Sequence, residues 1–359
     1  MQINNHSPWA AQLAPAWGKD RKQQMTVIVK TGFCWDTQGK LTPIEQNDIA
    51  FEGAERFFDD DYENASLAAS NDLVPFKDGF ELLVTGTAHP ANKQAKKMQL
   101  AVAFTRGSDE NLKTDWEKQL TVFGRRHWQR TLLGTVPSIP PAIEPTPVRY
   151  EYAYGGKKTD KDGNEKLKKG LYLQNPSGLG FSAGKTEHRL PLIEREPLIT
   201  HPSQQVKPAG FGPIANSWEP RKSLFAELDN KAAANARCPY PASLNTKLYN
   251  SAPEDQQFTT PPADGTCLVL SGWHPDIALQ RIELPTTGPS VMVFRQAQWQ
   301  AMPMAWDTLI IDADNQRLYQ LWRGAIPFDP AHIELMQFHL TDPTHQQWLN
   351  KQAATKEHA

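Results

Sequence analysis

Proline occurs throughout the chain and limits what the chain can fold into. It accounts for 29 of the 359 residues, about 8% against an average near 5%. Because proline fixes φ and cannot donate a backbone hydrogen bond, it ends helices and obstructs the pairing of central strands. Together with 22 glycines and 11 tryptophans, this favours many short strands joined by defined turns, with large aromatic side chains between the sheets.

Alternating, β-branched segments occur in both halves of the chain. The clearest is Thr26–Phe33, TVIVKTGF, which the turn Asp36–Lys40 follows. Three further strands, Glu81–Ala88, Met98–Thr105 and Lys118–Phe123, are predicted to form an antiparallel meander. We expect a mainly β fold of antiparallel, sandwich-like sheets, with long Pro/Gly-rich loops and a few short helices. The further predicted strands are Glu81–Ala88, Met98–Thr105, Lys118–Phe123, Val148–Tyr154, Thr266–Trp273, Ile277–Leu284, Val291–Arg295, Thr308–Ile311 and Arg317–Trp322.

Five prolines between Pro137 and Pro147 predict a stiff connector that sheet pairing cannot cross. We therefore expect an N-terminal β subdomain over residues 1–140 and a second β subdomain over 141–330, which contains the stretch 208–256. Residues 331–359 are predicted to form a C-terminal segment that ends in a frayed tail.

Charge and hydropathy lower the expectation of several functions. The 38 basic and 40 acidic residues leave a net charge of −2, so no bulk field attracts nucleic acid or an anionic membrane. Mean hydropathy is −0.58 without a long apolar run, which predicts no membrane insertion. Residues 1–18 lack a signal-peptide pattern, and Cys34, Cys238 and Cys267 are too widely spread for a disulfide framework. We expect a cytoplasmic protein.

The stretch 208–256 is the least regular part of the chain. Pro208, Gly210, Gly212 and Pro213 alternately lock the backbone and free it of a Cβ, which predicts a specific, irregular loop. Farther along the same stretch, Leu224–Ala236 is predicted to be a short helix, capped by the serine before it.

Two interpretations of the aromatic and basic residues in this stretch stay open. Trp218, Arg221, Phe225 and Tyr249 supply the large, semi-rigid contact area that dominates protein interfaces. Alternatively, Trp218 lies in the core and Arg221 pairs with a buried carboxylate to fix the loop.

Patterns typical of catalysis or of metal binding are weak. Cys267 and His274 are the nearest thiol and imidazole, but their segment is apolar. Glu254 and Asp255 are neighbours that would point to opposite faces of an extended segment. His332, His339 and His345 have no partners at zinc-site spacing.

The loop from Lys157 to Lys169 reads as a solvated hairpin tip in preference to a basic docking patch. We expect no catalytic residue, metal or cofactor. The glycine-rich pieces at 154–156 and 178–180 are interpreted as bends.

Several short motifs occur in a fixed order along the chain. They are Asp72–Pro75 and Lys77; Val122–Gly124, Arg126 and Trp128; Tyr152–Gly156; Asn175, Pro176, Gly178 and Gly180; Pro208, Gly210, Phe211, Gly212 and Pro213; Trp218, Pro220 and Arg221; and Asn250, Ala252, Pro253, Asp255 and Gln256. This ordered set resembles a bacterial family labelled as a domain of unknown function, whose members are encoded beside PAAR-domain toxins of the type VI secretion system. The resemblance covers about residues 27–295, and the chain departs from the family pattern at Glu227–Leu228 and Ser243–Asn245.

This resemblance implies a non-enzymatic adaptor or chaperone that binds a PAAR-domain effector and loads it onto the VgrG spike. The second hypothesis is a hydrolase of carbohydrate or peptide that uses Cys267 with His274, or a carboxylate of Glu254–Asp255. The predicted partner-binding residues are Phe211, Trp218, Arg221, Phe225, Tyr249, Asp255 and Gln256. The predicted structural loop residues are Pro208, Gly210, Gly212, Pro213, Gly155, Gly156, Asn175, Pro176, Gly178 and Gly180.

Overall fold

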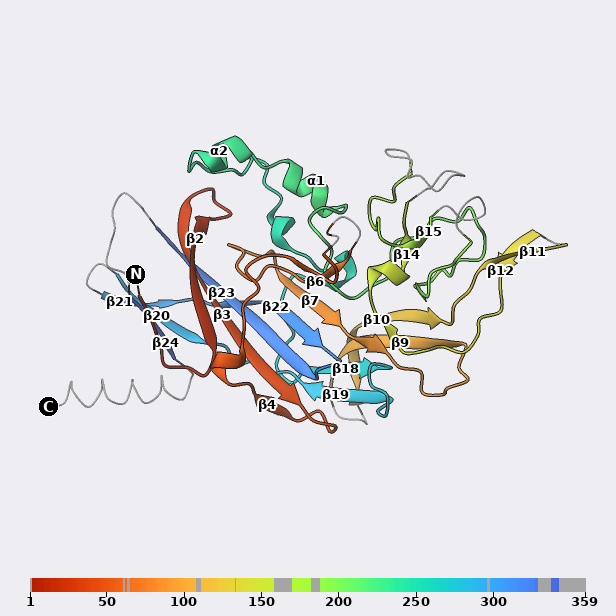
Figure 1. Cartoon of the computed structure of the whole chain (residues 1–359). Helices are drawn as coiled ribbons and strands as arrows, with labels where there is room; N and C mark the ends of the chain where they lie inside the picture. Colours follow the sequence, from red (N-terminus) through yellow and green to blue (C-terminus); the bar gives the residue numbers. More distant parts are fainter. Residues whose placement is uncertain are drawn as a thin grey trace.

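The computed structural model describes residues 2–60, 62, 65–107, 111–132, 134–157, 170–181, 188–295, 298–328 and 337–341. The fold is mainly β with predominantly antiparallel sheets, as predicted (Figure 1). The described residues include two short α-helices, α1 (Arg221–Ala226) and α2 (Asn230–Ala234). None of the helices in those residues is long and apolar enough to cross a membrane.

A seven-stranded sheet forms the centre of the molecule. Its strand order is β17-β7-β22-β23-β3-β2, with β4 paired to β3. Neighbouring strands are antiparallel except for β7 and β22, which pair in parallel. The strands are β2 (Ala10–Trp17), β3 (Gln23–Trp35), β4 (Leu41–Pro43), β7 (Phe80–Thr85), β17 (Gln257–Phe258), β22 (Ala305–Asp312) and β23 (Arg317–Pro327).

A five-stranded antiparallel sheet has the order β16-β10-β9-β18-β19, and a four-stranded sheet has the order β1-β24-β20-β21. The five strands are β9 (Lys97–Arg106), β10 (Lys113–Phe123), β16 (Ile193–Glu194), β18 (Cys267–Ser271) and β19 (Leu279–Glu283). The four strands are β1 (Gln2–Asn5), β20 (Ser290–Arg295), β21 (Gln298–Met302) and β24 (Gln337–Thr341).

Four two-stranded ladders complete the strands that the structure describes. They are β5 (Arg56–Phe57) with β6 (Leu67–Ala69), β8 (Thr87–Ala88) with β13 (Thr146–Pro147), β11 (Trp128–Thr131) with β12 (Gly134–Pro137), and β14 (Tyr154–Gly155) with β15 (Leu179–Gly180).

One hydrophobic core joins the large sheets. Leu82 and Leu309 of the seven-stranded sheet lie in the same buried cluster as Leu100 and Leu268 of the five-stranded sheet. Phe80 contacts Phe104 across the two sheets with ring centroids 6.5 Å apart. The sandwich-like packing therefore follows from apolar side chains on the facing sides of both sheets.

The two large sheets take strands from both sides of the predicted domain boundary at residue 140. The seven-stranded sheet combines β2, β3, β4 and β7 with β17, β22 and β23, and the five-stranded sheet likewise takes strands from both sides of the boundary. The proline-rich connector interrupts pairing locally, but the strands on either side of it complete the same sheets.

The predicted meander is wrong in its first strand. β9 and β10 form the expected antiparallel hairpin, whereas β7 lies in the other large sheet, parallel to β22. The first five side chains of β7 are all buried, and a strand covered on both faces suits the interior of a sheet.

The predicted helix Leu224–Ala236 is two helices. α1 begins at Arg221 and ends at Ala226, and the Asp229 carboxylate then caps α2 by accepting from the backbone N–H groups of Lys231 and Ala232 at 3.0 and 2.9 Å. An aspartate that bonds backbone donors in a cap competes with continuation of the first helix. The predicted cap, Ser223, lies inside α1.

The C-terminal segment predicted over 331–359 is described only at residues 337–341, which form strand β24. The rest of this predicted segment, including the frayed tail, lies outside the described residues.

We expect residues 1–140 expressed alone to show no cooperative urea transition, because both large sheets would lack strands from the second half. The full-length chain, as control, should unfold cooperatively when followed by tryptophan fluorescence. A cooperative transition of the fragment would contradict the interleaved core.

Candidate functional site

The loop that begins the stretch 208–256 lies against β7. The carbonyl oxygen of Phe211 accepts from the backbone N–H of Val84 at 3.1 Å, and the Phe211 ring contacts Trp273 with centroids 5.3 Å apart. A Cβ on Gly210 would lie 2.6 Å from the Tyr150 ring. Only glycine therefore lets the loop approach so closely, as the sequence predicted for this position.

Gln256 connects this loop to both large sheets. Its side-chain amide donates to the carbonyl oxygens of Leu82 and Phe211 at 2.7 and 2.9 Å. Its Oε1 accepts from Lys118 Nζ at 2.7 Å, and Lys118 also donates to Asp255 Oδ1 at 2.8 Å. A buried amide with these partners is satisfied on both ends and orients the loop.

Lys118 is the most perturbed lysine at this site. Burial lowers its pKa to about 8, against the opposing effect of the Asp255 carboxylate. Asp255 is also bound by Arg195, whose guanidinium lies 3.0 Å from Oδ2. The Asp255 carboxylate therefore pairs with two cations, Lys118 of β10 and Arg195.

Trp218 and Arg221 both make contacts within the protein. Trp218 is 1% exposed and packs edge-on against Tyr150. Arg221 donates to the carboxylate of Glu55 at 2.6 Å and to the carbonyl oxygen of Ile214. These contacts fit the structural interpretation, and partner binding through these two residues stays a prediction.

The seven predicted partner-binding residues divide into two groups. Phe211, Trp218, Arg221 and Gln256 are at most 7% exposed, so they can act on a partner only through the loop that they shape. The other three, Phe225, Tyr249 and Asp255, are half-buried.

Phe225 and Tyr249 belong to a satellite cluster over Phe76. The ring of Tyr249 contacts Phe76 and Phe225 with centroids 5.0 and 6.0 Å apart, and its hydroxyl lies 2.9 Å from that of Tyr240. These side chains hold the helical part of the stretch against the body of the protein.

The predicted bends around Asn175 pack closely against one another. The Asn175 amide donates to the carbonyl oxygens of Tyr150 and Tyr154 at 2.8 and 3.0 Å. A Cβ on Gly178 would lie 2.4 Å from that amide nitrogen, and one on Gly155 would lie 2.1 Å from the Asn175 carbonyl oxygen. The structural role predicted for these residues fits the contacts, and Pro176 and Gly180 are buried beside them.

An open pocket of about 890 Å³, here called the central pocket, is walled by this stretch. Its lining includes both acidic and basic side chains, and most of them are paired, for example Lys207 with Glu254 at 3.6 Å. It is lined by Lys118, Tyr150, Gln174, Arg195–Pro197, Gln205–Pro208, Ile214, Glu219–Arg221, Leu224, Asn245, Lys247, Asn250, Ala252–Asp255 and Gln257.

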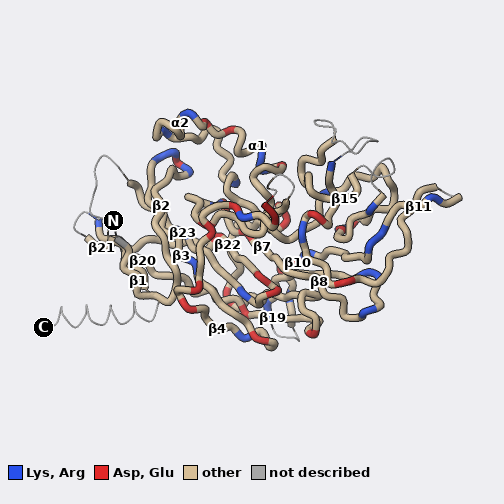
Figure 2. Tube along the Cα trace, viewed as in Figure 1, with Lys and Arg blue, Asp and Glu red and all other residues tan. Residues whose placement is uncertain are grey.

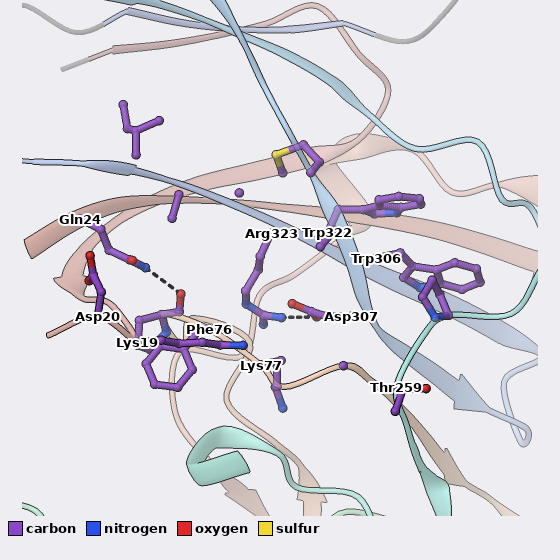
Figure 3. A pocket seen from close by; sticks show the side chains of 18 of the residues that line it. Lys19, Asp20, Gln24, Phe76, Lys77, Thr259, Trp306, Asp307, Trp322 and Arg323 are labelled. Carbon is purple, nitrogen blue, oxygen red and sulfur yellow. Dashed lines mark hydrogen bonds and ion pairs between the residues drawn. The ribbon is translucent and has the colours of Figure 1, made fainter. Parts of the chain in front are cut away.

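A second pocket, of about 980 Å³, lies beside residues 72–79, here called the strap (Figure 3). Arg323 on its floor pairs with Asp307 and donates to the carbonyl oxygens of Val74 and Asp72, the latter at 2.6 Å. Gln24 donates to the Pro75 carbonyl oxygen at 3.0 Å. The motif from Asp72 to Lys77 is thus hydrogen-bonded to the sheet. Its two charged side chains also form ion pairs with the sheet, Asp72 with Lys30 and Lys77 with Glu81.

Glu81 joins the strap to the end of the central stretch. Its carboxylate accepts from Lys77 Nζ, and from the backbone N–H groups of Ser251 and Ala252 at 2.8 and 3.0 Å. Burial alone would raise the pKa of Glu81, but the charge of Lys77 and these hydrogen bonds outweigh it and hold the pKa below its usual value. Glu81 is therefore an ionised, fully bonded carboxylate.

Cys267 and His274, the thiol and imidazole of the hydrolase hypothesis, lie at one end of β18 and beyond its other end. Cys267 and Ser271 are the two ends of β18, about 13 Å apart at the usual strand rise, and His274 lies farther along. The His274 ring accepts from the backbone N–H groups of Asp276 and Ile277 at 3.1 and 3.2 Å.

No group of three or more potential metal ligands occurs in the part of the chain that the structure describes. His332, His345 and residues 158–169 of the lysine-rich loop lie outside that part.

Sequence reasoning missed Lys118 as a member of the site, although a signal was present. Lys118 alternates in phase with Leu120 and Val122, all three of which are buried on β10. A lysine in phase with buried apolar residues must reach a partner, and here the partners come from the central stretch.

Comparison with protein families gives one match. The model of a family described as "Uncharacterized protein conserved in bacteria (DUF2169)" matches residues 20–323. No curated protein and no solved structure matches the chain.

We expect Glu81→Leu to lower the free energy of unfolding by about 3 to 5 kcal/mol, because it leaves the Lys77 ammonium buried without its partner. Adding Lys77→Met to Glu81→Leu should recover part of that loss in urea denaturation, since it removes the unpaired charge. A double variant less stable than the single one would contradict this account.

The lowered pKa of Lys118 makes stability depend on pH. Between about 8 in the folded state and 10.5 in the unfolded chain, the unfolded state binds one more proton, so the free energy of unfolding rises with pH. Relative to Lys118→Met, the wild type should gain roughly 2 to 3 kcal/mol across this range. Equal pH profiles in chemical denaturation would refute the shift.

Proposed function

The chain belongs to DUF2169, the family described as uncharacterized proteins conserved in bacteria, and on that premise we propose that it is a non-enzymatic adaptor. In this proposal it acts in the cytoplasm, binds a PAAR-domain effector and promotes its loading onto the VgrG spike of the type VI secretion system. The order of sequence motifs from Asp72 to Gln256 suggests these partners.

The observation that carries the proposal is the construction of the central pocket. Its wall is a loop without regular secondary structure over residues 202–214, yet buried contacts of Phe211, Arg221 and Gln256 hold it against both sheets. A wall held in one conformation loses little entropy on binding. This suits recognition of a polypeptide segment by shape.

The charges around the pocket suit the same role. Asp255 is shared by Lys118 and Arg195, and Lys207 pairs with Glu254, so the lining presents polar groups of both signs without a strong net field. A polar rim around a firm wall is typical of protein interfaces that form and dissociate.

One observation favours the alternative, a hydrolase: the pKa of Lys118 is lowered to about 8 in a pocket, as at many catalytic centres. Its ammonium is, however, engaged by Asp255 and Gln256. Among the described residues that line the central pocket there is no serine, threonine or cysteine to act as nucleophile. The carboxylates of Glu254 and Asp255, which also line the pocket, are paired with Lys207 and with Lys118 and Arg195, so the adaptor accounts for more of the geometry.

The test is affinity purification of the tagged chain from its native cells. We expect a PAAR-domain effector and a VgrG protein to co-purify, and Lys207→Glu with Lys247→Glu to reduce their recovery, because both exposed lysines stand on the pocket rim. Lys40→Glu, at an exposed turn outside the pocket, is the matched control.

Two outcomes would count against the proposal. If neither partner is recovered from cells that express the secretion system, the adaptor function fails. If the rim variant and the control recover both partners equally, the central pocket is not the binding site. Hydrolysis of a peptide or carbohydrate by the purified chain, abolished by Lys118→Met, would favour the alternative.

A further inference from the structure

We propose that the hairpin of β11 and β12 is a second protein-binding element, whose tip leucine enters an apolar socket bordered by carboxylates on a partner protein. Residues 124–143 are called the arm below. The inference rests on the proposed function in requiring a protein partner, but it needs neither the central pocket nor the identity of that partner.

The arm carries the most exposed large apolar side chains that the structure describes. Leu132 at the hairpin tip is 106% exposed and Ile139 is 78% exposed. Figure 1 shows the hairpin extending away from the sheets, and none of the described residues covers the Leu132 side chain. Isolated exposed leucines are common, but a leucine at the end of a projecting hairpin has the geometry of an anchor residue.

The base of the arm is fixed firmly. Trp128 is buried with Tyr154 and Leu190 in a satellite cluster, and its backbone N–H donates to the His188 carbonyl oxygen at 2.8 Å. The guanidinium of Arg126 pairs with the buried carboxylate of Glu194. The hairpin is thus attached to the body of the protein by buried contacts, which limits the directions in which it projects.

The charge of the arm indicates the chemistry of its partner. Residues 124–143 contain three arginines and no aspartate or glutamate, in a chain whose net charge is −2. Arg126 is used in the base, whereas Arg125 and Arg130 are exposed. Figure 2 shows basic but no acidic residues along the hairpin. Charge complementarity therefore points to carboxylates around the socket.

A protein fits this surface better than nucleic acid does. Two exposed arginines are few for binding a phosphate backbone, which is held by many cations. Contact with phosphates would not bury the apolar side chains of Leu132 and Ile139, whereas an apolar socket on a protein would. Nucleic acid is accordingly an outcome that the experiment must be able to detect.

The experiment is photo-crosslinking in native cells with a benzoylphenylalanine placed at residue 132, and separately at residue 279. Leu279 on edge strand β19 is 59% exposed and is the matched control. We expect residue 132, and not 279, to crosslink to one protein, at an apolar residue flanked by Asp or Glu. Arg125→Glu with Arg130→Glu should lower that yield several-fold.

With the crosslinked protein purified, Leu132→Asp should weaken its binding to the chain about tenfold or more, as expected for an interface anchor. Leu279→Asp should change binding less than about twofold. Both variants should keep the wild-type melting temperature, because the side chains are exposed.

Several results would overturn the inference. They are an absence of protein crosslinks at residue 132, crosslinks to nucleic acid, equal crosslinking at 132 and 279, or unchanged binding by Leu132→Asp. Crosslinks at 132 to a protein unrelated to secretion, together with recovery of neither a PAAR-domain effector nor VgrG, would support the arm and refute the proposed function. Recovery of either partner with no crosslinks at 132 would support the proposed function and refute the arm.

Discussion

Glu81 is the buried carboxylate on which the arrangement of the loops depends. It accepts hydrogen bonds from Lys77 in the strap and from Ser251, 170 residues farther along the chain. Removing either segment from β7 would leave a charge in the core without its donors, which costs several kcal/mol. Two segments far apart in sequence are therefore fixed to one strand.

Similar polar contacts recur wherever this chain lacks regular structure. Lys118 holds the end of the central stretch through Asp255 and Gln256, Arg323 holds the strap, and Arg126 with Glu194 holds the base of the arm. Hydrophobic burial is non-directional, so it cannot by itself select one path for a loop rich in proline and glycine. Buried hydrogen-bonded charges can, because any other path leaves them unpaired.

The central pocket and the arm offer contrasting kinds of surface. Around the pocket most charges are already paired and the specificity resides in the shape of the wall, whereas the arm presents an uncovered leucine beside two exposed arginines. An adaptor that brings two proteins together needs two surfaces that do not compete. In the proposed function the pocket and the arm would meet that need, one by shape and the other by an apolar anchor.

Alternation, proline spacing and glycine-rich bends were sufficient to predict from sequence the mainly β class, nine of the ten expected strands and the bends around Asn175, because these depend on neighbours a few residues away. The tenth expected strand, Val148–Tyr154, instead contains the 3-10 helix Tyr150–Tyr152. The parallel pairing of β7 with β22, the interleaving of both halves and the burial of Trp218 were decided by the tertiary structure. Sequence placed Lys118 in phase with buried residues, yet its partner Asp255 lies 137 residues away. Only the folded chain brings such groups within hydrogen-bonding distance, since pairing across that separation depends on the path of every loop between them.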